Sequence, residues 1–342
     1  MSKSYFNGDA GIALDGLPWH LLQDGRVLLT GGSGVVGIHM AAAFRRLIDE
    51  GSKLRLCVTF QNPVDGVIAE VLNHPQIEVI CGDLTEKSFR SRLDKAELIL
   101  HAAGYGQPGR FLENPSKTIR LNTEATLDLI EKVTSGGRFL FVSTSELYSG
   151  LPDGQSHRED QIGHTNTTHP RACYIEGKRC GEAICNSARS SGIKAVSARL
   201  ALAYGPGARP EDRRVLYTFI QKALKNGNIE MMDNGDARRT YCYAADAVRI
   251  MLRAVLEGCE PIYNVGGRGG LLIRELAEKI GSQLGVPVIY PQNAKPIEGA
   301  PGDVALNMSL YEKEFGVLEY VNFDDGLRKT IDWHVGVNAK LK

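Results

Sequence analysis

The sequence predicts an α/β fold in which a parallel β-sheet is covered by helices on both faces. Three observations favour it. Short apolar runs alternate with helical stretches over the first 200 residues, a glycine-rich turn joins the first run to the first helix, and the 342 residues suffice for a large core. Such alternation is typical of parallel sheets. Beyond residue 200 the pattern loosens, and we expect a smaller mixed α/β lobe there.

The elements follow from the apolar runs and from glycine stop signals. Strands of the sheet are expected at residues 26–30, 54–60, 77–81, 98–102, 139–143 and 195–200. Helices between them are expected at residues 35–50, 64–72, 87–93, 116–133 and 173–190. In the later part we expect helices at 214–225, 244–257, 273–284 and 324–334, and strands near 230–236 and at 262–265.

Composition excludes several classes of protein. The 40 Lys and Arg residues balance 40 Asp and Glu residues, which argues against a nucleic-acid partner. No apolar run approaches the ~20 residues that a membrane helix needs, and the first residues lack the apolar core of a signal peptide. The seven cysteines form no CxxC pair, which suggests reduced thiols in the cytoplasm and no metal site. Three histidines in a polar loop, at positions 157, 164 and 169, are expected to be solvated.

A glycine loop follows the first predicted strand. Gly31, Gly34 and Gly37 are spaced as GxxGxxG, with Val35 and Val36 opening the helix. Glycine permits a tight turn and lets the backbone approach a pyrophosphate, which the amides at the helix N-terminus attract. A loop at a strand-to-helix junction is therefore interpreted as a dinucleotide site in a Rossmann-like, doubly wound sheet. The alternative is a turn that is merely tight.

The expected adenosine end of that site is less clearly defined. The second strand runs into residues 59–62 without a carboxylate for the ribose hydroxyls or an arginine for a 2′-phosphate. NAD is the expected cofactor, and NADP is not excluded. Asp83, followed by Leu84, is positioned to bond the adenine amino group, or to cap the next helix. The small Ala102 and Ala103 leave room for a cofactor against the backbone.

These expectations divide the chain into three parts. Residues 1–24 form an N-terminal extension with one short helix near 17–22. Residues 25–200 form the dinucleotide-binding domain. Residues 201–342 form mainly a substrate-binding lobe, with some segments returning to the first domain.

A second motif supplies candidate catalytic residues. Tyr174 and Lys178 are four residues apart and so share one face of a helix. A neighbouring ammonium, helped by a nicotinamide cation, stabilises the phenolate and lowers the tyrosine pKa, which makes the tyrosine a usable base. Thr144, at the end of the fifth strand, is placed to share the substrate proton with Tyr174, because strand ends on one side of the sheet converge.

Together these motifs resemble the extended short-chain dehydrogenase/reductase family of nucleotide-sugar epimerases, dehydratases and decarboxylases. The resemblance covers about residues 25–334 and is nearest to the UDP-glucuronate decarboxylases. Segments similar to theirs are residues 114–118, 143–148, 170–179 and 239–246.

The resemblance implies oxidation of the sugar C4 hydroxyl by the bound cofactor. In a decarboxylase, Ser145 and Glu146 would position the ring, while Arg239 would hold the carboxylate and help reprotonate the enolate. In a 4,6-dehydratase Glu146 would instead remove the C5 proton, and a 4-epimerase would need neither step. Glu146 as a cap and Arg239 as a diphosphate ligand remain alternatives, as does a non-catalytic dinucleotide sensor.

The resemblance also implies a nucleotide-diphosphate sugar as ligand and a homodimer formed through the helices at 116–133 and 173–190. Arg209 and Arg214 are candidate diphosphate ligands. Three positions depart from the family pattern: Leu202 and Thr218 stand where the family has asparagines, and residues 298–303 lack arginine. We therefore expect intact redox machinery beside an altered substrate pocket.

Overall fold

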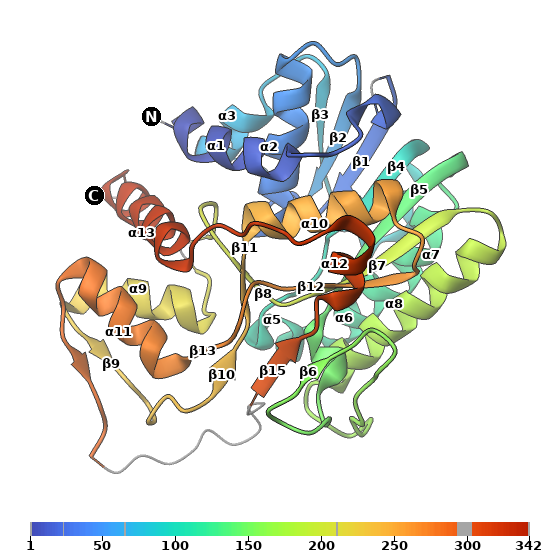
Figure 1. The fold of residues 1–342 in the computed structure, drawn as a ribbon. Coiled ribbons are helices and arrows are strands. Elements are labelled where there is room, and N and C mark those ends of the chain that lie inside the picture. Colours follow the sequence, from blue (N-terminus) through green and yellow to red (C-terminus); the bar gives the residue numbers. More distant parts are fainter. Residues whose placement is uncertain (1, 23, 65, 210, 293–302, 341–342) are drawn as a thin grey trace.

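A seven-stranded parallel sheet is the centre of the molecule (Figure 1). The computed structural model describes residues 2–22, 24–64, 66–209, 211–292 and 303–340. The strand order is β12-β7-β5-β4-β1-β2-β3, and each neighbouring pair is parallel. The strands are β1 (Arg26–Thr30), β2 (Arg55–Phe60), β3 (Ile77–Cys81), β4 (Ala96–His101), β5 (Val133–Thr144), β7 (Lys194–Leu200) and β12 (Ile262–Val265). The predicted doubly wound fold is confirmed.

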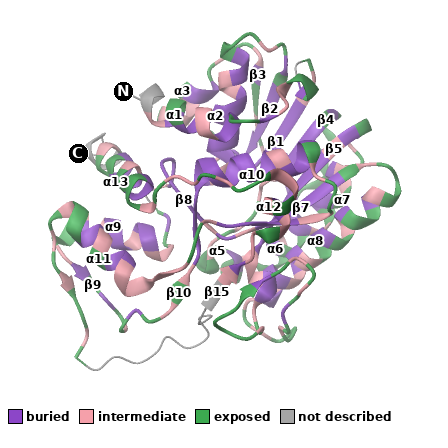
Figure 2. Ribbon diagram, viewed as in Figure 1, coloured by how far each residue is buried: buried purple, intermediate pink, exposed green. Residues whose placement is uncertain are grey.

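Helices cover both faces of the sheet, which explains the continuous apolar runs of its strands. In β1, Val27 and Leu29 face the core under one helical layer, while Leu28 faces the other core. The first layer holds α2 (Val35–Asp49), α3 (Gly66–Leu72) and α10 (Ala244–Glu257). The second holds α4 (Lys87–Ser91), α6 (Pro115–Asn122), α7 (Glu124–Ile130) and α8 (Ala172–Ser190). Figure 2 shows the resulting burial of the central strands.

The chain beyond β7 builds a smaller mixed region beside the carboxyl ends of the strands (Figure 1). β8 (Leu202–Tyr204) pairs in parallel with β11 (Tyr241–Tyr243). A four-stranded sheet has the order β13-β10-β15-β6, from β13 (Leu271–Leu272), β10 (Arg238–Arg239), β15 (Asp303–Leu306) and β6 (Ser156–His157). The other elements are α9 (Val215–Asn226), β9 (Ile229–Glu230), α11 (Ile273–Leu284), β14 (Val288–Ile289), α12 (Ser309–Phe315) and α13 (Phe323–Lys340).

The N-terminal extension contains a helix that sequence periodicity did not reveal. α1 (Ser2–Leu14) packs against α2 and α10, and buries Phe6, Ala10 and Ala13. Its two glycines and small apolar residues give almost no amphipathic signal, because helix stability here comes from tertiary packing. The short helix expected near residues 17–22 is present as a 3₁₀ turn, Trp19–Leu22.

Three further expectations were wrong in detail. The helix expected at 116–133 is interrupted at Thr123, because side chains in this stretch bond to backbone carbonyls, as Thr123 Oγ1 does to Ile119 O at 2.9 Å. The strand near 230–236 is limited to Ile229–Glu230. His157 is buried at 3% exposure, stacked on Tyr148, because β6 pairs with β15.

Candidate functional site

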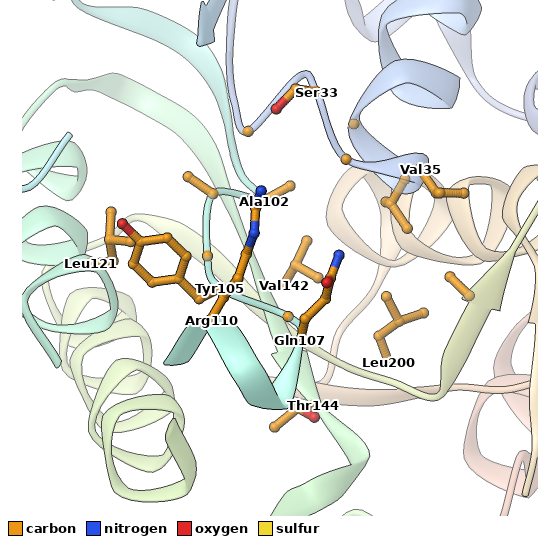
Figure 3. A pocket seen from close by; sticks show the side chains of 18 of the residues that line it. Ser33, Val35, Ala102, Tyr105, Gln107, Arg110, Leu121, Val142, Thr144 and Leu200 are labelled. Carbon is orange, nitrogen blue, oxygen red and sulfur yellow. The ribbon is translucent and has the colours of Figure 1, made fainter. Parts of the chain in front are cut away.

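A cleft of about 530 Å³ runs along the carboxyl ends of the central strands, where parallel α/β sheets bind their ligands (Figure 3). The predicted site residues converge on it from segments distant in sequence. All of them except Arg239 line this cleft: Gly31, Gly34, Val35, Val36, Gly37, Asp83, Leu84, Ala102, Ala103, Thr144, Ser145, Glu146, Tyr174, Lys178, Arg209 and Arg214.

The glycine loop has the close approaches that its spacing predicts. Gly31 has a φ of +80°, and a Cβ there would lie 2.6 Å from the Ala102 carbonyl. A Cβ on Gly37 would lie 2.2 Å from Gly31 O, so this glycine lets α2 pack on the turn. A Cβ on Gly34 would meet only Gly31 O, at 3.7 Å. The loop is therefore tight against the protein at two glycines and open toward the cleft at the third, which suits a pyrophosphate.

A buried histidine orients the floor of the cleft beside this loop. His101 Nε2 lies 2.9 Å from Leu121 O, and Nδ1 lies 2.8 Å from Thr30 Oγ1. Burial lowers the pKa of His101 to about 3, so the ring is neutral and its one proton is donated to Leu121. Thr30 then donates to Nδ1 and accepts from the Ala103 amide at 3.3 Å. This relay holds the end of β4 in place for a ligand.

Asp83, at the adenosine end, already accepts hydrogen bonds from other residues of the protein. Its carboxylate accepts from Lys117 Nζ at 2.7 Å and from the Thr85 amide and hydroxyl at 2.9 and 2.7 Å. Burial opposes ionisation, but these hydrogen bonds hold the pKa of Asp83 below its usual range. Asp83 therefore stabilises the turn before α4, but it does not cap that helix, whose N-cap residue is Glu86. Residues 59–62 line the cleft here, and Gln61 and Asn62 are exposed.

The tyrosine, lysine and threonine expected to be catalytic lie together at the other end. Tyr174 is 8% exposed, hydrogen-bonds Thr144, and stacks on Phe111 with ring centroids 4.7 Å apart. Lys178 Nζ donates to Val142 O at 2.6 Å.

The expected lowering of the tyrosine pKa involves the nicotinamide cation as well as Lys178, so it stays a prediction for the protein with cofactor bound. Burial and then the charge of Glu146 raise the pKa of Tyr174 to about 12. Burial also lowers the pKa of Lys178 to about 7, and its Nζ is 5.9 Å from the centre of the tyrosine ring. The ammonium therefore lies near the ring but is directed to a carbonyl. Further positive charge in the cleft is needed to favour the phenolate.

Glu146 lies directly after β5, in the 3₁₀ turn Ser145–Tyr148, whose first amides are capped by Thr144. Its Oε1 accepts from Arg171 Nη2 at 2.7 Å, and its Oε2 is buried without a hydrogen-bond partner in the described part of the chain. Burial raises the pKa of Glu146, while the charges of Arg171 and then Arg239 oppose the rise. Arg239 is therefore near Glu146 although it does not line the cleft. Sequence reasoning placed Arg171 only within a motif. In the structure, Arg171 forms an ion pair with the Glu146 carboxylate.

A buried ion pair behind the cleft also escaped sequence reasoning. Glu182 accepts from Arg199 Nη2 at 2.9 Å and from the Ser143 hydroxyl at 2.6 Å. These bonds join α8, β5 and β7 just behind the residues that are expected to be catalytic. The available signal was spacing, since Glu182 lies one helical turn after Lys178.

The two candidate diphosphate ligands differ in their surroundings. Arg214 is paired with Asp212, with Nη2 and Oδ2 2.6 Å apart. Arg209 has its pKa lowered by burial and then by the charge of Arg110. Arg110, which belongs to no sequence motif, projects into the cleft from α5 (Pro108–Glu113) (Figure 3). Arg110 and Arg209 therefore bring positive charge to the same cleft. Leu202 also lines it, whereas residues 298–302 lie outside the described part.

The parallel sheet, the glycine loop and the Tyr-Lys-Thr group define a dinucleotide-binding protein with an oxidoreductase-type site. A model of the NAD dependent epimerase/dehydratase family matches residues 27–266. The chain belongs to this family, and the prediction of the family is confirmed. The expectation of NAD as cofactor agrees with the family's description.

Individual relatives and solved structures within this family show which proteins the chain is similar to. UDP-glucuronic acid decarboxylase 1 of Danio rerio is 30% identical over 259 residues, 75% of this chain and 60% of that protein. UDP-glucuronic acid decarboxylase 6 of Arabidopsis thaliana is 31% identical over 282 residues, 81% of this chain and 78% of that protein. This chain thus spans about 60% of the Danio rerio relative's length. A dTDP-glucose 4,6-dehydratase double mutant of Streptomyces venezuelae has the same fold, with a TM-score of 0.78 and 24% identity over 92% of this chain and 98% of that one.

Among the described residues, no helix is both long and apolar enough to cross a membrane. Within the same ranges, no three His, Cys, Asp or Glu side chains gather as a metal site.

Proposed function

We propose that this protein oxidises the C4 hydroxyl of a nucleotide-diphosphate sugar with NAD, and that its reaction is decarboxylation of UDP-glucuronate through a 4-keto intermediate. One observation carries the proposal. Glu146 lies beside the Tyr174–Thr144 pair, forms an ion pair with Arg171 and lies near Arg239. The charges of Arg171 and Arg239 both act on Glu146, and guanidinium groups bind carboxylates by charge-assisted hydrogen bonds, which suits a substrate that carries a carboxylate. The named activity of the relatives supports the same choice.

The cofactor fits the cleft, since Gly31 and Gly37 make the tight turn and Gly34 leaves open backbone. When bound, NAD supplies the electron acceptor for the C4 alcohol and the reductant for the later ketone. Residues of the glycine loop would hold its pyrophosphate, with Leu84, Ala102 and Ala103 along its path. With no carboxylate among residues 59–62, NADP remains an alternative.

The residues of this chain divide the proton transfers between them. Tyr174 accepts the C4 hydroxyl proton, and Thr144 holds the same oxygen by a hydrogen bond. Lys178 contributes positive charge when protonated. The 4-ketone makes the sugar a β-keto acid, so the C5–C6 bond breaks and carbon dioxide leaves while its electrons form an enolate. Arg239 binds the departing carboxylate and assists protonation at C5, and Ser145 positions the ring.

A 4,6-dehydratase is the strongest alternative, because Glu146 is correctly placed after Thr144. Its Oε1 is bonded to Arg171, but its raised pKa and its Oε2, which has no hydrogen-bond partner among the described residues, also suit a base for the C5 proton, so product analysis decides between the two reactions. A 4-epimerase would need no carboxylate here, and a non-catalytic sensor would need neither Tyr174 nor Lys178.

Product analysis separates these reactions. The protein would be incubated with NAD and with UDP-glucuronate, UDP-glucose, dTDP-glucose or GDP-mannose, and the products weighed by mass spectrometry. Decarboxylation predicts loss of 44 mass units, as carbon dioxide, from UDP-glucuronate alone. Loss of water from a neutral sugar would identify a dehydratase, and a change of C4 configuration without a mass change would identify an epimerase.

We further propose a cytoplasmic homodimer in which residues 25–200 bind the cofactor and residues 201–342 mainly bind the sugar nucleotide. Ile119 on α6 and Leu127 on α7 are 45% and 51% exposed beside α8, which offers an apolar dimer face. Light scattering should give twice the chain mass of 37.3 kDa. Ile119→Glu with Leu127→Glu should give monomers.

A further inference from the structure

Asp9, on the N-terminal helix α1, is the centre of a buried polar cluster that the proposed reaction does not use. Its side chain is 0% exposed. The carboxylate accepts from His39 Nε2 at 3.1 Å, from the Tyr243 hydroxyl at 2.5 Å and from Lys329 Nζ at 2.9 Å. The partners belong to α2, β11 and α13. The Asp9 cluster (Asp9, His39, Tyr243, Lys329) thus joins four elements that are distant in sequence.

On the side of α2, the Asp9 cluster is connected to the glycine loop through the ring of His39. His39 Nδ1 lies 2.8 Å from Val35 O, and Nε2 faces the Asp9 carboxylate. Although burial opposes ionisation, the hydrogen bonds from His39, Tyr243 and Lys329 hold the pKa of Asp9 below its usual range. Val35 is the first residue of α2 after the glycine loop and lines the cleft. Asp9 is therefore linked through one ring to the turn that faces the cofactor.

The same helix and its partners also support the loop at residues 205–209, whose last residue, Arg209, lines the cleft. Residues 205–208 of this loop are buried, so its position depends on the side chains packed around it. Ala244, His39 and Tyr243 lie 3.2, 3.4 and 3.5 Å from a Cβ position on Gly205. Ile38 and Phe6 lie 2.6 and 3.3 Å from one on Gly207, and Trp333 Nε1 donates to Ala208 O at 2.9 Å.

We propose that Asp9 is a positioning residue that couples the two halves of the cleft, so that NAD and the nucleotide-sugar bind cooperatively through the Asp9 cluster. His39 contacts both walls of the cleft, through Val35 O on the cofactor side and beside Gly205 on the other side. Ordering one wall therefore reduces the cost of ordering the other. The identity of the ligands rests on the proposed function, while the coupling rests on the geometry of residues 6–9, 35–39, 205–209, 243 and 329.

The test measures coupling without turnover. NADH affinity would be measured by fluorescence titration with and without saturating UDP, as a nucleotide probe that cannot react. In the unaltered protein UDP should tighten NADH binding by about fivefold or more. Asp9→Asn keeps the shape of the side chain but removes the charge that holds His39 and Lys329. It should reduce the effect of UDP to less than about twofold.

Asp15→Asn is the matched control, because Asp15 is 74% exposed and pairs with Arg249 at 3.4 Å outside the cluster. It should retain the full effect of UDP. If Asp9→Asn does not fold, Lys329→Met and Tyr243→Phe each delete one bond of the cluster and should weaken the coupling separately.

Three results would overturn the inference: no effect of UDP in the unaltered protein, full coupling in folded Asp9→Asn, or variants that lose only thermal stability. Carbon dioxide release from UDP-glucuronate is scored in a separate assay. Coupling without that release would refute the proposed reaction and leave the role of Asp9 standing. Release of carbon dioxide without coupling would refute the role of Asp9 and leave the proposed reaction standing.

Discussion

The two ends of the cleft are built differently. At the reacting end Thr144, Tyr174 and Lys178 are buried, and the ion pair of Glu182 with Arg199 lies behind them. At the adenosine end Gln61 is exposed, and no carboxylate follows β2 within residues 59–62. Burial makes the reacting end intolerant of change, because a displaced polar group loses its only partners. The exposed end tolerates substitution, so cofactor preference there depends on few contacts.

The largest effect is expected at the reacting end, from Tyr174→Phe. This change removes the proposed base and should lower kcat by about 10³-fold, within the usual range for a lost acid–base residue. NADH affinity should change little, because the ring and its stacking on Phe111 remain. Steady-state kinetics and fluorescence titration check the two claims.

Tyr290→Phe is the control for that experiment, since Tyr290 is 41% exposed and bonds Glu278 outside the cleft. Turnover by Tyr174→Phe at the unaltered rate would refute the proposed chemistry.

The second-largest effect is expected from the Glu182–Arg199 ion pair, which lies behind the reacting end of the cleft. Glu182→Gln keeps the shape but leaves the buried Arg199 without its counter-charge, so the free energy of unfolding should fall by about 3 kcal/mol. Urea denaturation measures this loss. Glu176→Gln is the control on the same helix, because its pair with Arg179 is about one third exposed. A loss of less than about 1 kcal/mol for Glu182→Gln would show that the reacting end is not held from behind in this way.

Lys178 gives the reacting end a pH dependence. Its pKa is about 7 in the folded protein, against an ordinary value of 10.5. Between these values the unfolded chain binds the proton and the folded chain does not, so raising the pH through this window stabilises the fold. The free energy of unfolding, compared with that of Lys178→Met, should therefore increase between pH 7 and pH 9, so that the folded state becomes more stable. An unchanged difference would mean that burial does not shift the pKa of this lysine.

The smallest effect is expected at the adenosine end. Gln61→Asp places a carboxylate after β2, where it would bond ribose hydroxyls and repel a 2′-phosphate. The ratio of NADH to NADPH affinities should rise by about tenfold or less, with unchanged kcat at saturation. Glu113→Gln alters charge elsewhere on the cleft wall and should leave this ratio unaltered. No response to Gln61→Asp would place the ribose away from β2.

Sequence reasoning succeeded where function imposes a local pattern. The glycine spacing and the four-residue spacing of Tyr174 and Lys178 each reflect a short-range requirement, a turn or one helix face. Both predicted groups line the cleft. α1 was missed, since it is stabilised by packing on α2 and α10 rather than by its own amphipathic pattern.

The sequence by itself determined the alternating fold, the family and the residues that gather at the strand ends, because periodicity and motif spacing are local properties of the chain. Only the tertiary structure decided how those residues are charged and held. Arg171 reaches Glu146 from 25 positions away, and Lys329 reaches Asp9 from 320 positions away. Burial, which shifts the pKa values of Tyr174 and Lys178, likewise arises only when distant segments exclude water from the cleft.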